Sequence, residues 1–370
     1  MSDIQATFSP LDRAHMAHAL RLAERGLYTT APNPCVGCVI THGEDVVGEG
    51  WHQRAGEAHA EVYALQAAGA RADGATAYVT LEPCAHQGRT PPCVEALITA
   101  KLARVVVACR DPHASAGGGV ERLQAAGIAV DVGLMGAQAR ELNRGFCSRI
   151  ERGRPWLRVK LAMSLDARTA LDNGHSRWIT GEPARADVHR WRAQSSALLT
   201  GSGTVLADDP LLTVRLPEGE DFNPPLRVVL DTGLATRQGA HVLDGSVPTV
   251  MVHAQHARRA AYFDAVECLA VPEHEGHLDL HAVLGLLAQR EINEVQVEAG
   301  AQLAGNFFAQ GLVDELLLYI APVLLGDDAR PLLRLPALSD MAERWSLRVY
   351  DQRAVGTDWR LCLRPPVETL

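Results

Sequence analysis

The chain has 370 residues and a formal net charge of −9, with 44 acidic against 35 basic side chains. This length is too great for one ordinary domain and favours two hydrophobic cores. The acidic balance argues against a dedicated nucleic-acid-binding protein, which needs clustered Lys and Arg to contact phosphates. The sequence lacks an apolar run of about 18 residues that could span a membrane, and residues 1–8 lack the apolar core of a signal peptide. The eight cysteines therefore predict reduced, cytoplasmic thiols and metal ligands, not a disulfide framework.

The first part of the chain predicts alternating helices and strands. Ser9 is a capping residue before Pro10, so a helix should run to about Arg25 and end at Gly26. Strands are expected at 36–41, 45–49, 74–81, 104–109 and 128–132, with helices at 58–68, 94–100 and after residues 117–119. This order predicts a layered α/β domain.

The pair Cys35 and Cys38 has the spacing of a redox pair or of half a zinc site. It lies at the start of an apolar run that predicts a strand entering a core, where free cysteines behave as small hydrophobic residues. We therefore interpret both thiols as structural, and we expect the amide of Asn33 to be the functional group of that loop.

His59, Glu61, Cys84 and Cys93 carry the strongest chemical signal in the chain. One imidazole and two thiolates fill three positions of a tetrahedral zinc, and a fourth position left for water distinguishes a catalytic zinc from a structural one. Glu61 is then free to move a proton. The order His-x-Glu followed by Pro-Cys and a later Cys is the signature of zinc deaminases.

A purely structural zinc knuckle is the alternative interpretation of these residues. Residues two apart do not face each other on a helix, so His59 and Glu61 can converge only in the first helical turn. Cys84 should follow the end of a strand, and Cys93 should open a helix after Pro91 and Pro92.

The second part of the chain begins after an arginine-rich stretch. Residues 143–154 are interpreted as a linker, and Pro155 starts a new unit. Strands at 197–200 and 294–298 both end in glycine turns before helices, which is a weak signal for a phosphate site. A hairpin of residues 345–350 and 359–363 ends the chain, and the histidines near 253–256 and 274–281 are expected on the surface.

Taken together, these residues resemble the bifunctional riboflavin-biosynthesis deaminase-reductase family, usually called RibD, over nearly the whole chain. The matching strings cover residues 32–34, 48–52, 59–62, 80–84, 88–93, 160–166, 176–180, 204–210 and 297–300. The resemblance implies a cytidine-deaminase-like α/β/α layered domain at 1–147, a linker at 148–154 and a dihydrofolate-reductase-like α/β domain at 155–370. One departure is Asp111-Pro112-His113, where the family pattern has Asn in the third position.

The resemblance also implies two reactions. The first is the zinc-dependent removal of the 2-amino group of a diaminopyrimidinone ribosylamino phosphate. The second is the NADPH-dependent reduction of its ribosyl group to ribityl. In the deaminase, Asn33, His52, His86 and Arg89 are expected to contact the substrate, with the last two facing its phosphate. In the reductase, Lys160 is a candidate proton donor.

The remaining expectations concern the reductase site. Ala162, Trp178, Thr204, Asp208 and the turn formed by Gly300, Ala301, Gln302, Leu303, Ala304, Gly305 and Asn306 are expected to contact NADPH. Ser176, Arg192, Leu212, Arg215 and Glu298 are expected to contact the substrate, and the two guanidinium groups suit a phosphomonoester.

Two other functions stay open at this stage. The chain could deaminate another heterocycle, with a second half that only binds nucleotide, or it could be a catalytically silent zinc-stabilised binding protein. The resemblance further implies a homodimer through the reductase half. The expected partner is a small phosphorylated pyrimidine, with neither nucleic acid nor membrane involved.

Overall fold

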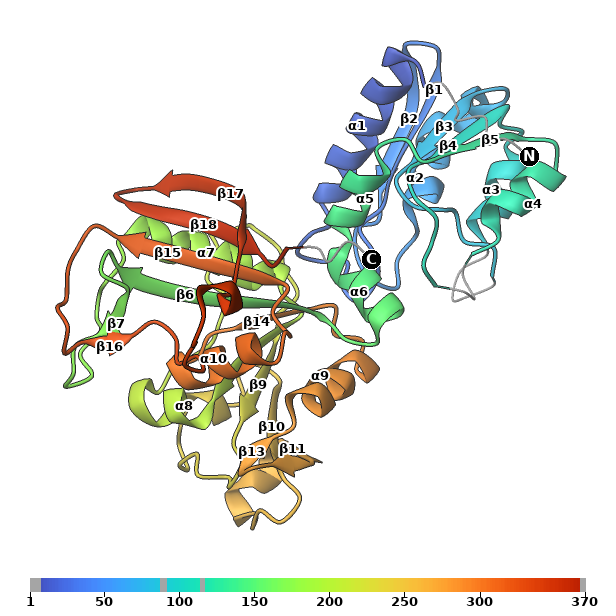
Figure 1. Cartoon of the computed structure of the whole chain (residues 1–370). Coiled ribbons are helices and arrows are strands. Elements are labelled where there is room, and N and C mark those ends of the chain that lie inside the picture. Colours follow the sequence, from blue (N-terminus) through green and yellow to red (C-terminus); the bar gives the residue numbers. More distant parts are fainter. Residues whose placement is uncertain (1–7, 87–91, 114–116, 367–370) are drawn as a thin grey trace. The chain divides into compact units, whose positions relative to one another are not determined.

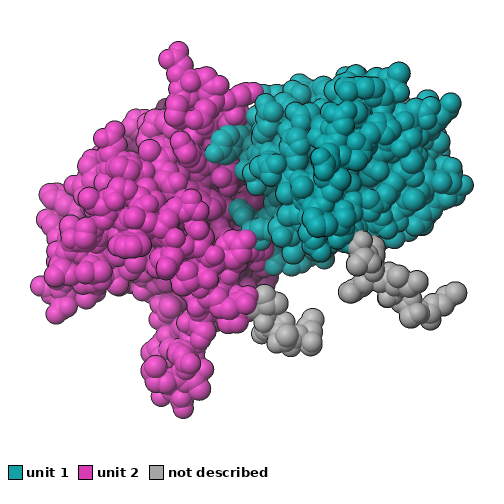
Figure 2. Space-filling model, turned by 90° about the horizontal axis from the view of Figure 1, so that it is seen from above, with its two compact units in different colours: residues 1–153 teal, residues 154–370 magenta. Residues whose placement is uncertain are grey.

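The chain divides into two compact units, residues 1–153 and 154–370, in the computed structural model (Figure 1, Figure 2). The structure describes residues 8–86, 92–113 and 117–366. No helix in these ranges is long and apolar enough to cross a membrane. All eight cysteines are free thiols.

The first unit is a five-stranded sheet between two layers of helices (Figure 1). The strand order is β2-β1-β3-β4-β5, with β1 antiparallel to both neighbours and β3, β4 and β5 parallel. The strands are β1 Gly37–His42, β2 Asp45–Trp51, β3 Thr76–Val79, β4 Arg104–Val107 and β5 Ala129–Val132. The helices are α1 Pro10–Glu24, α2 Ala60–Ala68, α3 Cys93–Thr99, α4 Gly119–Ala125, α5 Gly136–Leu142 and α6 Arg144–Arg152, with a short 3-10 turn at Gly69–Ala72.

Alternating apolar side chains fill both faces of this sheet. Met16 of α1 packs with Val39 and Val106 on one face, whereas Ala64 of α2 packs with Cys38 and Val105 on the other. The predicted capping box of α1 is present, because the Ser9 side chain accepts a hydrogen bond from the Asp12 N–H and the Asp12 carboxylate accepts from the Ser9 N–H. The α/β/α layering predicted from the sequence is confirmed.

The segment expected to be a linker is helical as far as Arg152. Phe146 and Cys147 are buried in α6, and Gly153 ends that helix with a left-handed φ of 66°. The next residue, Arg154, forms a two-pronged ion pair with Asp314, at 2.8 and 2.9 Å.

The second unit is built on a nine-stranded sheet of order β11-β10-β9-β8-β14-β6-β15-β18-β17. Seven neighbouring strands are parallel, and the hairpin β17–β18 adds antiparallel to β15. These strands are β6 Trp156–Ser164, β8 Ala197–Gly201, β9 Leu226–Leu230, β10 Thr249–Ala254, β11 Glu267–Val271, β14 Glu294–Val297, β15 Glu315–Ala321, β17 Arg348–Val355 and β18 Asp358–Arg364. Two small ribbons pair β7 Arg168–Ala170 with β16 Arg330–Pro331 and β12 Glu273–His274 with β13 His277–Leu278.

Helices cover both faces of this sheet as well (Figure 1). They are α7 Glu182–Gln194, α8 Ser202–Asp208, α9 Leu280–Gln289 and α10 Ala301–Ala309, with 3-10 turns at His241–Leu243, Ala261–Ala265 and Met341–Glu343. Val283 of α9 and Phe307 of α10 belong to the main core with Val159 and Val297, whereas Val188 of α7 packs with Leu317 on the other face. The carboxyl ends of the parallel strands, where α/β sheets bind ligands, carry the glycine turns noted in the sequence.

Candidate active sites

The described part of the first unit brings His59, Cys84 and Cys93 together. Their ligand atoms all lie within 4.8 Å of one another. The Nδ1 atom of His59 is 3.2 Å from the Cys93 Sγ and 3.7 Å from the Cys84 Sγ. A tetrahedral zinc with bonds of about 2.0–2.3 Å separates such atoms by roughly 3.5–3.8 Å. The three side chains therefore fit one zinc ion and leave a fourth position open.

Local structure places each of these side chains. His59 is the N-cap of α2 and has extended backbone angles, φ −78° and ψ 165°, and its ring lies against the two cysteines. Glu61 in that first turn is 3% exposed. Cys84 follows β3, and Cys93 is the first residue of α3, where its N–H donates to the Cys84 Sγ at 3.4 Å. The convergence at a first helical turn is as predicted.

The electrostatics of the cluster favour one thiolate even without metal. A hydrogen bond from Cys93 is the main cause that lowers the pKa of Cys84 to about 4. The same bond raises the pKa of Cys93, because that thiol is then the proton donor of the pair. Burial raises the pKa of Glu61 above its ordinary value, which suits a group that takes up and releases a proton.

Asn33 and His52 stand beside the cluster as a hydrogen-bonded pair. The His52 ring meets the His59 ring edge-on, with centroids 5.4 Å apart. Its Nδ1 is 3.0 Å from the carbonyl oxygen of Ala58, which can only accept, so Nδ1 carries the proton. Its Nε2 then accepts from the Asn33 Nδ2 at 3.0 Å. Burial lowers the pKa of His52, consistent with a neutral ring.

Two residues that organise this site were missed by the sequence reasoning. Glu82 is buried, and its carboxylate accepts from the backbone N–H groups of Asp111, Gly118 and Val120 at 3.1–3.2 Å. It thereby ties the loop before α4 to the chain that carries Cys84. Asn143 likewise binds both backbone groups of Cys35, at 2.7 and 2.9 Å, and fixes the loop of Asn33. Both contacts join distant parts of the chain, so no local pattern announces them.

The other expectations for the first unit have mixed outcomes. Cys35 and Cys38 are buried, as predicted for structural thiols. His86 is exposed, and Arg89 lies outside the described residues. In the altered Asp111-Pro112-His113 loop, the His113 N–H donates to the Asp111 carboxylate at 2.8 Å. Burial raises the pKa of Asp111.

The second unit contains a cavity of about 1340 Å³. Its lining includes the ends of β6, β8 and β14 and the first turns of α8 and α10. Thirteen of the expected reductase residues line it, namely Lys160, Ala162, Ser176, Arg192, Thr204, Asp208, Leu212, Glu298, Gly300, Ala301, Gln302, Leu303 and Asn306. Two glycine turns far apart in the sequence thus meet at one cavity.

Lys160, Glu298 and Arg192 form the charged centre of the cavity. The parallel register of β6 and β14 pairs Val159 with Val297, which sets Lys160 beside Glu298 on the same face. Burial lowers the pKa of Lys160. Burial alone would raise the pKa of Glu298, but its ion pair with Arg192 lowers it to about 2. A carboxylate and an amine whose pKa is lowered therefore stand side by side.

The Arg192 side chain makes hydrogen bonds within the protein that the sequence did not predict. Its Nε and Nη2 each donate to Glu298 at 2.7 Å, and its Nη1 donates to the Thr213 carbonyl at 2.8 Å. Each of its three nitrogen atoms thus donates one hydrogen bond within the protein, while Nη1 and Nη2 each carry a second N–H. Arg192 also lines the cavity, so its contact with the substrate stays a prediction. His189, which the sequence reasoning missed, accepts from the Arg215 N–H at 3.1 Å and fixes the neighbouring loop. Burial lowers the pKa of His189 to about 4.

Four expected reductase residues do not line the cavity. Ala304 is fully buried in the main core, and a Cβ on Gly305 would lie 1.9 Å from the carbonyl oxygen of Arg334. Both therefore face the protein interior, because only one side of α10 can face the cavity. Trp178 is 69% exposed and is flanked by the guanidinium groups of Arg177 and Arg185. Arg215 is exposed beside the loop that His189 fixes.

Comparisons with known proteins agree with the sites described in both units. The cytidine and deoxycytidylate deaminase zinc-binding region matches residues 9–109, and the RibD C-terminal domain matches residues 155–361. The chain is 49% identical to the riboflavin biosynthesis protein RibD of Escherichia coli K12, over 95% of this chain and 98% of that protein. The chain belongs to the RibD family.

Further relatives extend the match to solved structures. The Haemophilus influenzae RibD is 45% identical over 97% of this chain and 98% of its own. The Acinetobacter baumannii RibD structure, form 2, is 43% identical with a TM-score of 0.89, covering 96% of this chain and 99% of that one. A Thermotoga maritima diaminohydroxyphosphoribosylaminopyrimidine deaminase/5-amino-6-(5-phosphoribosylamino)uracil reductase is 30% identical with a TM-score of 0.86, covering 96% and 99%.

Family membership decides between the functions that the sequence left open. The chain is a bifunctional deaminase and reductase of riboflavin biosynthesis that uses Zn²⁺ and NADPH. A deaminase with a non-catalytic second half is not favoured, because the reductase family matches the whole second unit except its ends. The reading as a silent zinc-stabilised protein is likewise not favoured.

Proposed function

We propose that the first unit removes the 2-amino group of a diaminopyrimidinone ribosylamino phosphate, and that the second unit reduces the ribosyl group of the product. We assign the deaminase to residues 1–147 and the reductase to residues 155–370. The observation that carries the deaminase is the convergence of His59, Cys84 and Cys93 beside a buried Glu61, which lies in the first turn of α2.

In the proposed deaminase, His59, Cys84 and Cys93 would hold the zinc. When bound, zinc supplies the Lewis acidity that activates a water molecule toward a ring carbon. Glu61 is the group that moves protons, because it is buried, carries an oxygen pair and is not needed as a ligand. It takes a proton from the water and returns it to the departing amine, which leaves as ammonia.

Asn33 and His52 are proposed to orient the pyrimidine ring. Because the neutral His52 ring accepts from the Asn33 Nδ2, the Asn33 Oδ1 is fixed as the outward acceptor of that amide. Such an acceptor suits an N–H of the diaminopyrimidinone. His86 and Arg89 remain our candidates for the substrate phosphate.

In the proposed reductase, Lys160 and Glu298 face the ribosyl group. NADPH supplies the hydride when bound. Lys160 then donates a proton to the ring oxygen or to the open-chain carbonyl oxygen, and the lowered pKa caused by burial eases that transfer. Glu298, held in place by Arg192, keeps the ammonium of Lys160 within the site.

The remaining contacts in the reductase are proposed from the cavity lining and, for Trp178 and Arg215, from the family resemblance alone. We assign the cofactor to the side of Ala162, Thr204, Asp208 and the first turn of α10, with Trp178 at its edge. Ser176, Leu212 and Arg215 are assigned to the substrate. The buried side chain of Ala304 and the close approach of the Arg334 backbone to Gly305 support the turn from the protein interior.

We further propose a cytoplasmic homodimer that assembles through the reductase unit. Val349, Tyr350 and Trp359 of the β17–β18 hairpin are each more than half exposed, at the edge of the nine-stranded sheet. An exposed edge with apolar side chains favours pairing with a second copy. Sedimentation of the Trp359→Glu variant tests this, since a dimer through this hairpin should become a monomer.

The test of function separates the two units. Ammonia release is measured with the diaminopyrimidinone ribosylamino phosphate and zinc-loaded protein, and NADPH oxidation is measured with the deaminated product. We expect Glu61→Gln to lose only the first activity and Lys160→Met to lose only the second. A Glu61→Gln variant that releases ammonia at the normal rate would overturn the assignment of the first unit.

A further inference from the structure

An arginine stands at the rim of the second unit's cavity and has no role in the proposed chemistry. Arg334 lines the cavity together with Ala301, Gln302 and Asn306 of α10. It belongs to the stretch that follows the small ribbon β7–β16, and its side chain is exposed. The sequence reasoning did not single it out.

The backbone of Arg334 is locked to the first turn of α10. Its N–H donates to the carbonyl oxygen of Ala301 at 3.1 Å. Its own carbonyl oxygen lies where a Cβ on Gly305 would be, at 1.9 Å, so only glycine permits this approach. The position of the Arg334 backbone relative to α10 is therefore set by two contacts, and its side chain extends from there to line the cavity.

The charge of Arg334 is not neutralised by the described part of the protein. No carboxylate among those residues forms an ion pair with it, in contrast to Arg192 in the same cavity, which is paired with Glu298. The cavity-lining residues of α10 carry no charge. An unpaired guanidinium at a binding cavity of a protein with net charge −9 favours an anionic ligand group.

The first turn of α10 offers donors to the same anion. Gly300 is the N-cap, and no side chain caps this nine-residue helix. The N–H groups of its first turn are therefore available to a ligand, and phosphates bind at such helix starts because the helix dipole is positive there. Arg334 and the first two residues of this helix line the same cavity.

We propose that Arg334 binds the diphosphate of the nicotinamide dinucleotide at the start of α10. This rests on the proposed reductase function of the second unit. The guanidinium adds a charge-assisted bond to the backbone donors of Ala301 and Gln302. The diphosphate is common to NADPH and NADH, so Arg334 contributes affinity for the dinucleotide and not discrimination between its two forms.

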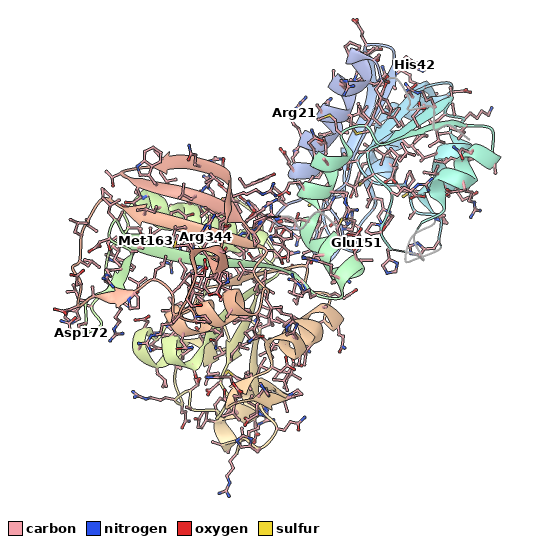
Figure 3. The ribbon with its side chains drawn as sticks, in the orientation of Figure 1. Arg21, His42, Glu151, Met163, Asp172 and Arg344 are labelled. Carbon is pink, nitrogen blue, oxygen red and sulfur yellow. The ribbon has the colours of Figure 1, made fainter. Side chains whose placement is uncertain are left out.

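The neighbouring Arg330 also lines the cavity, but its guanidinium contacts the protein. Its Nη2 donates to the carbonyl oxygen of Asp172 at 3.2 Å, and its guanidinium packs against Gly174. Asp172 lies on the loop beyond β7 (Figure 3). Arg330 thus holds that loop to the ribbon, and it is not a substitute for Arg334 in the test.

The experiment compares Arg334→Gln with Arg344→Gln as a matched control. Arg344 (labelled in Figure 3) is also an exposed arginine, and its Nη1 donates to the backbone carbonyl of Met341 at 2.8 Å. It is not among the residues that line the cavity. Dissociation constants for NADPH and NADH are measured by fluorescence titration of the full chain. For Arg334→Gln we expect both constants to rise by the same factor, roughly five- to tenfold, with no change in the control.

Two further readouts identify an electrostatic role. Added salt should weaken NADPH binding less in Arg334→Gln than in the wild type, since one screened contact is gone. Arg334→Lys should recover part of the affinity. Unchanged dissociation constants in Arg334→Gln would refute the proposal. Weaker binding of NADPH alone would also contradict it, because Arg334 would then contact the 2'-phosphate, which NADH lacks. A wild-type protein that binds neither dinucleotide would contradict the reductase assignment itself.

Discussion

The guanidinium of Arg192 and the carboxylate of Glu298 form a two-pronged ion pair, with both N–O distances at 2.7 Å. The pair joins α7 to the end of β14, beside Lys160. The contact makes Arg192 the group that orients Glu298. Three of the five N–H groups of Arg192 are used within the protein, so a substrate contact through the other two stays a proposal.

Breaking this pair should destabilise the second unit in a pH-dependent way. Glu298→Gln leaves the Arg192 cation largely buried without a counter-charge, which costs about 3 kcal/mol at pH 7. The pKa of Glu298 is lowered to about 2, below the ordinary Glu value of about 4.3. Its contribution is therefore present above pH 4.3 or so and is lost as the pH falls toward 2.

Denaturant unfolding at pH 7 and at pH 3 measures this effect. The difference between wild type and Glu298→Gln should shrink at the lower pH. Asp327→Asn is the control, because Asp327 is fully exposed and its contact with Arg168 is long, at 3.5 Å. A difference that does not depend on pH would mean that the charge of Glu298 is not what stabilises the fold.

The proton-donor role of Lys160 predicts the shape of a pH profile. Only the protonated amine can donate, so turnover of the reductase should fall as the pH rises through the pKa of Lys160. Burial lowers that pKa below the ordinary Lys value of about 10.4, so the fall comes at a lower pH than for a free lysine. Lys160→Arg stays protonated and should lack this limb, while ammonia release is unaffected. If turnover of Lys160→Arg falls over the same pH range, the titrating group is not Lys160.

The metal cluster was predictable from the sequence because its information is local. The spacing of His59 and Glu61 requires a helix start, which the structure has. Cys93 begins a helix as predicted, and Cys84 follows β3, although that strand already ends at Val79. The layered α/β order followed in the same way from apolar periodicity and from caps such as that of Ser9.

The residues that the sequence could not place depend on contacts between distant segments. Glu82 reaches the loop before α4, and Asn143 reaches Cys35 across 108 positions. The ion pair between Arg192 and Glu298 could not be predicted either, because the two residues lie 106 positions apart. Gly305 resembled part of a phosphate turn, and only the packing of residue 334 against it reveals its steric role.

Replacing Glu61 should separate metal binding from catalysis. Glu61→Gln keeps the shape of the buried side chain and removes its ability to accept a proton. We expect ammonia release to fall by about 10²- to 10⁴-fold while the zinc content stays the same. Zinc analysis alongside the rate measurement checks both parts. Loss of zinc in this variant would instead point to ligation by Glu61.

Replacing a metal ligand should lower the zinc content, which replacing Glu61 should not. Cys84→Ser removes one thiolate from the cluster, so zinc content after dialysis should fall well below about one ion per chain. Reductase activity on the deaminated product should persist. Cys268→Ser is the matched control, since Cys268 is a free, half-buried thiol in the second unit. Equal zinc retention in both variants would show that the ion is held elsewhere.

The most direct test of the whole account follows both products in one reaction. Purified zinc-loaded protein is given the diaminopyrimidinone ribosylamino phosphate, ammonia is measured, and NADPH is then added while its absorbance is recorded. We expect ammonia release first, followed by the oxidation of one NADPH for each ammonia released. NADPH oxidation without prior ammonia release, or no ammonia at all, would contradict it.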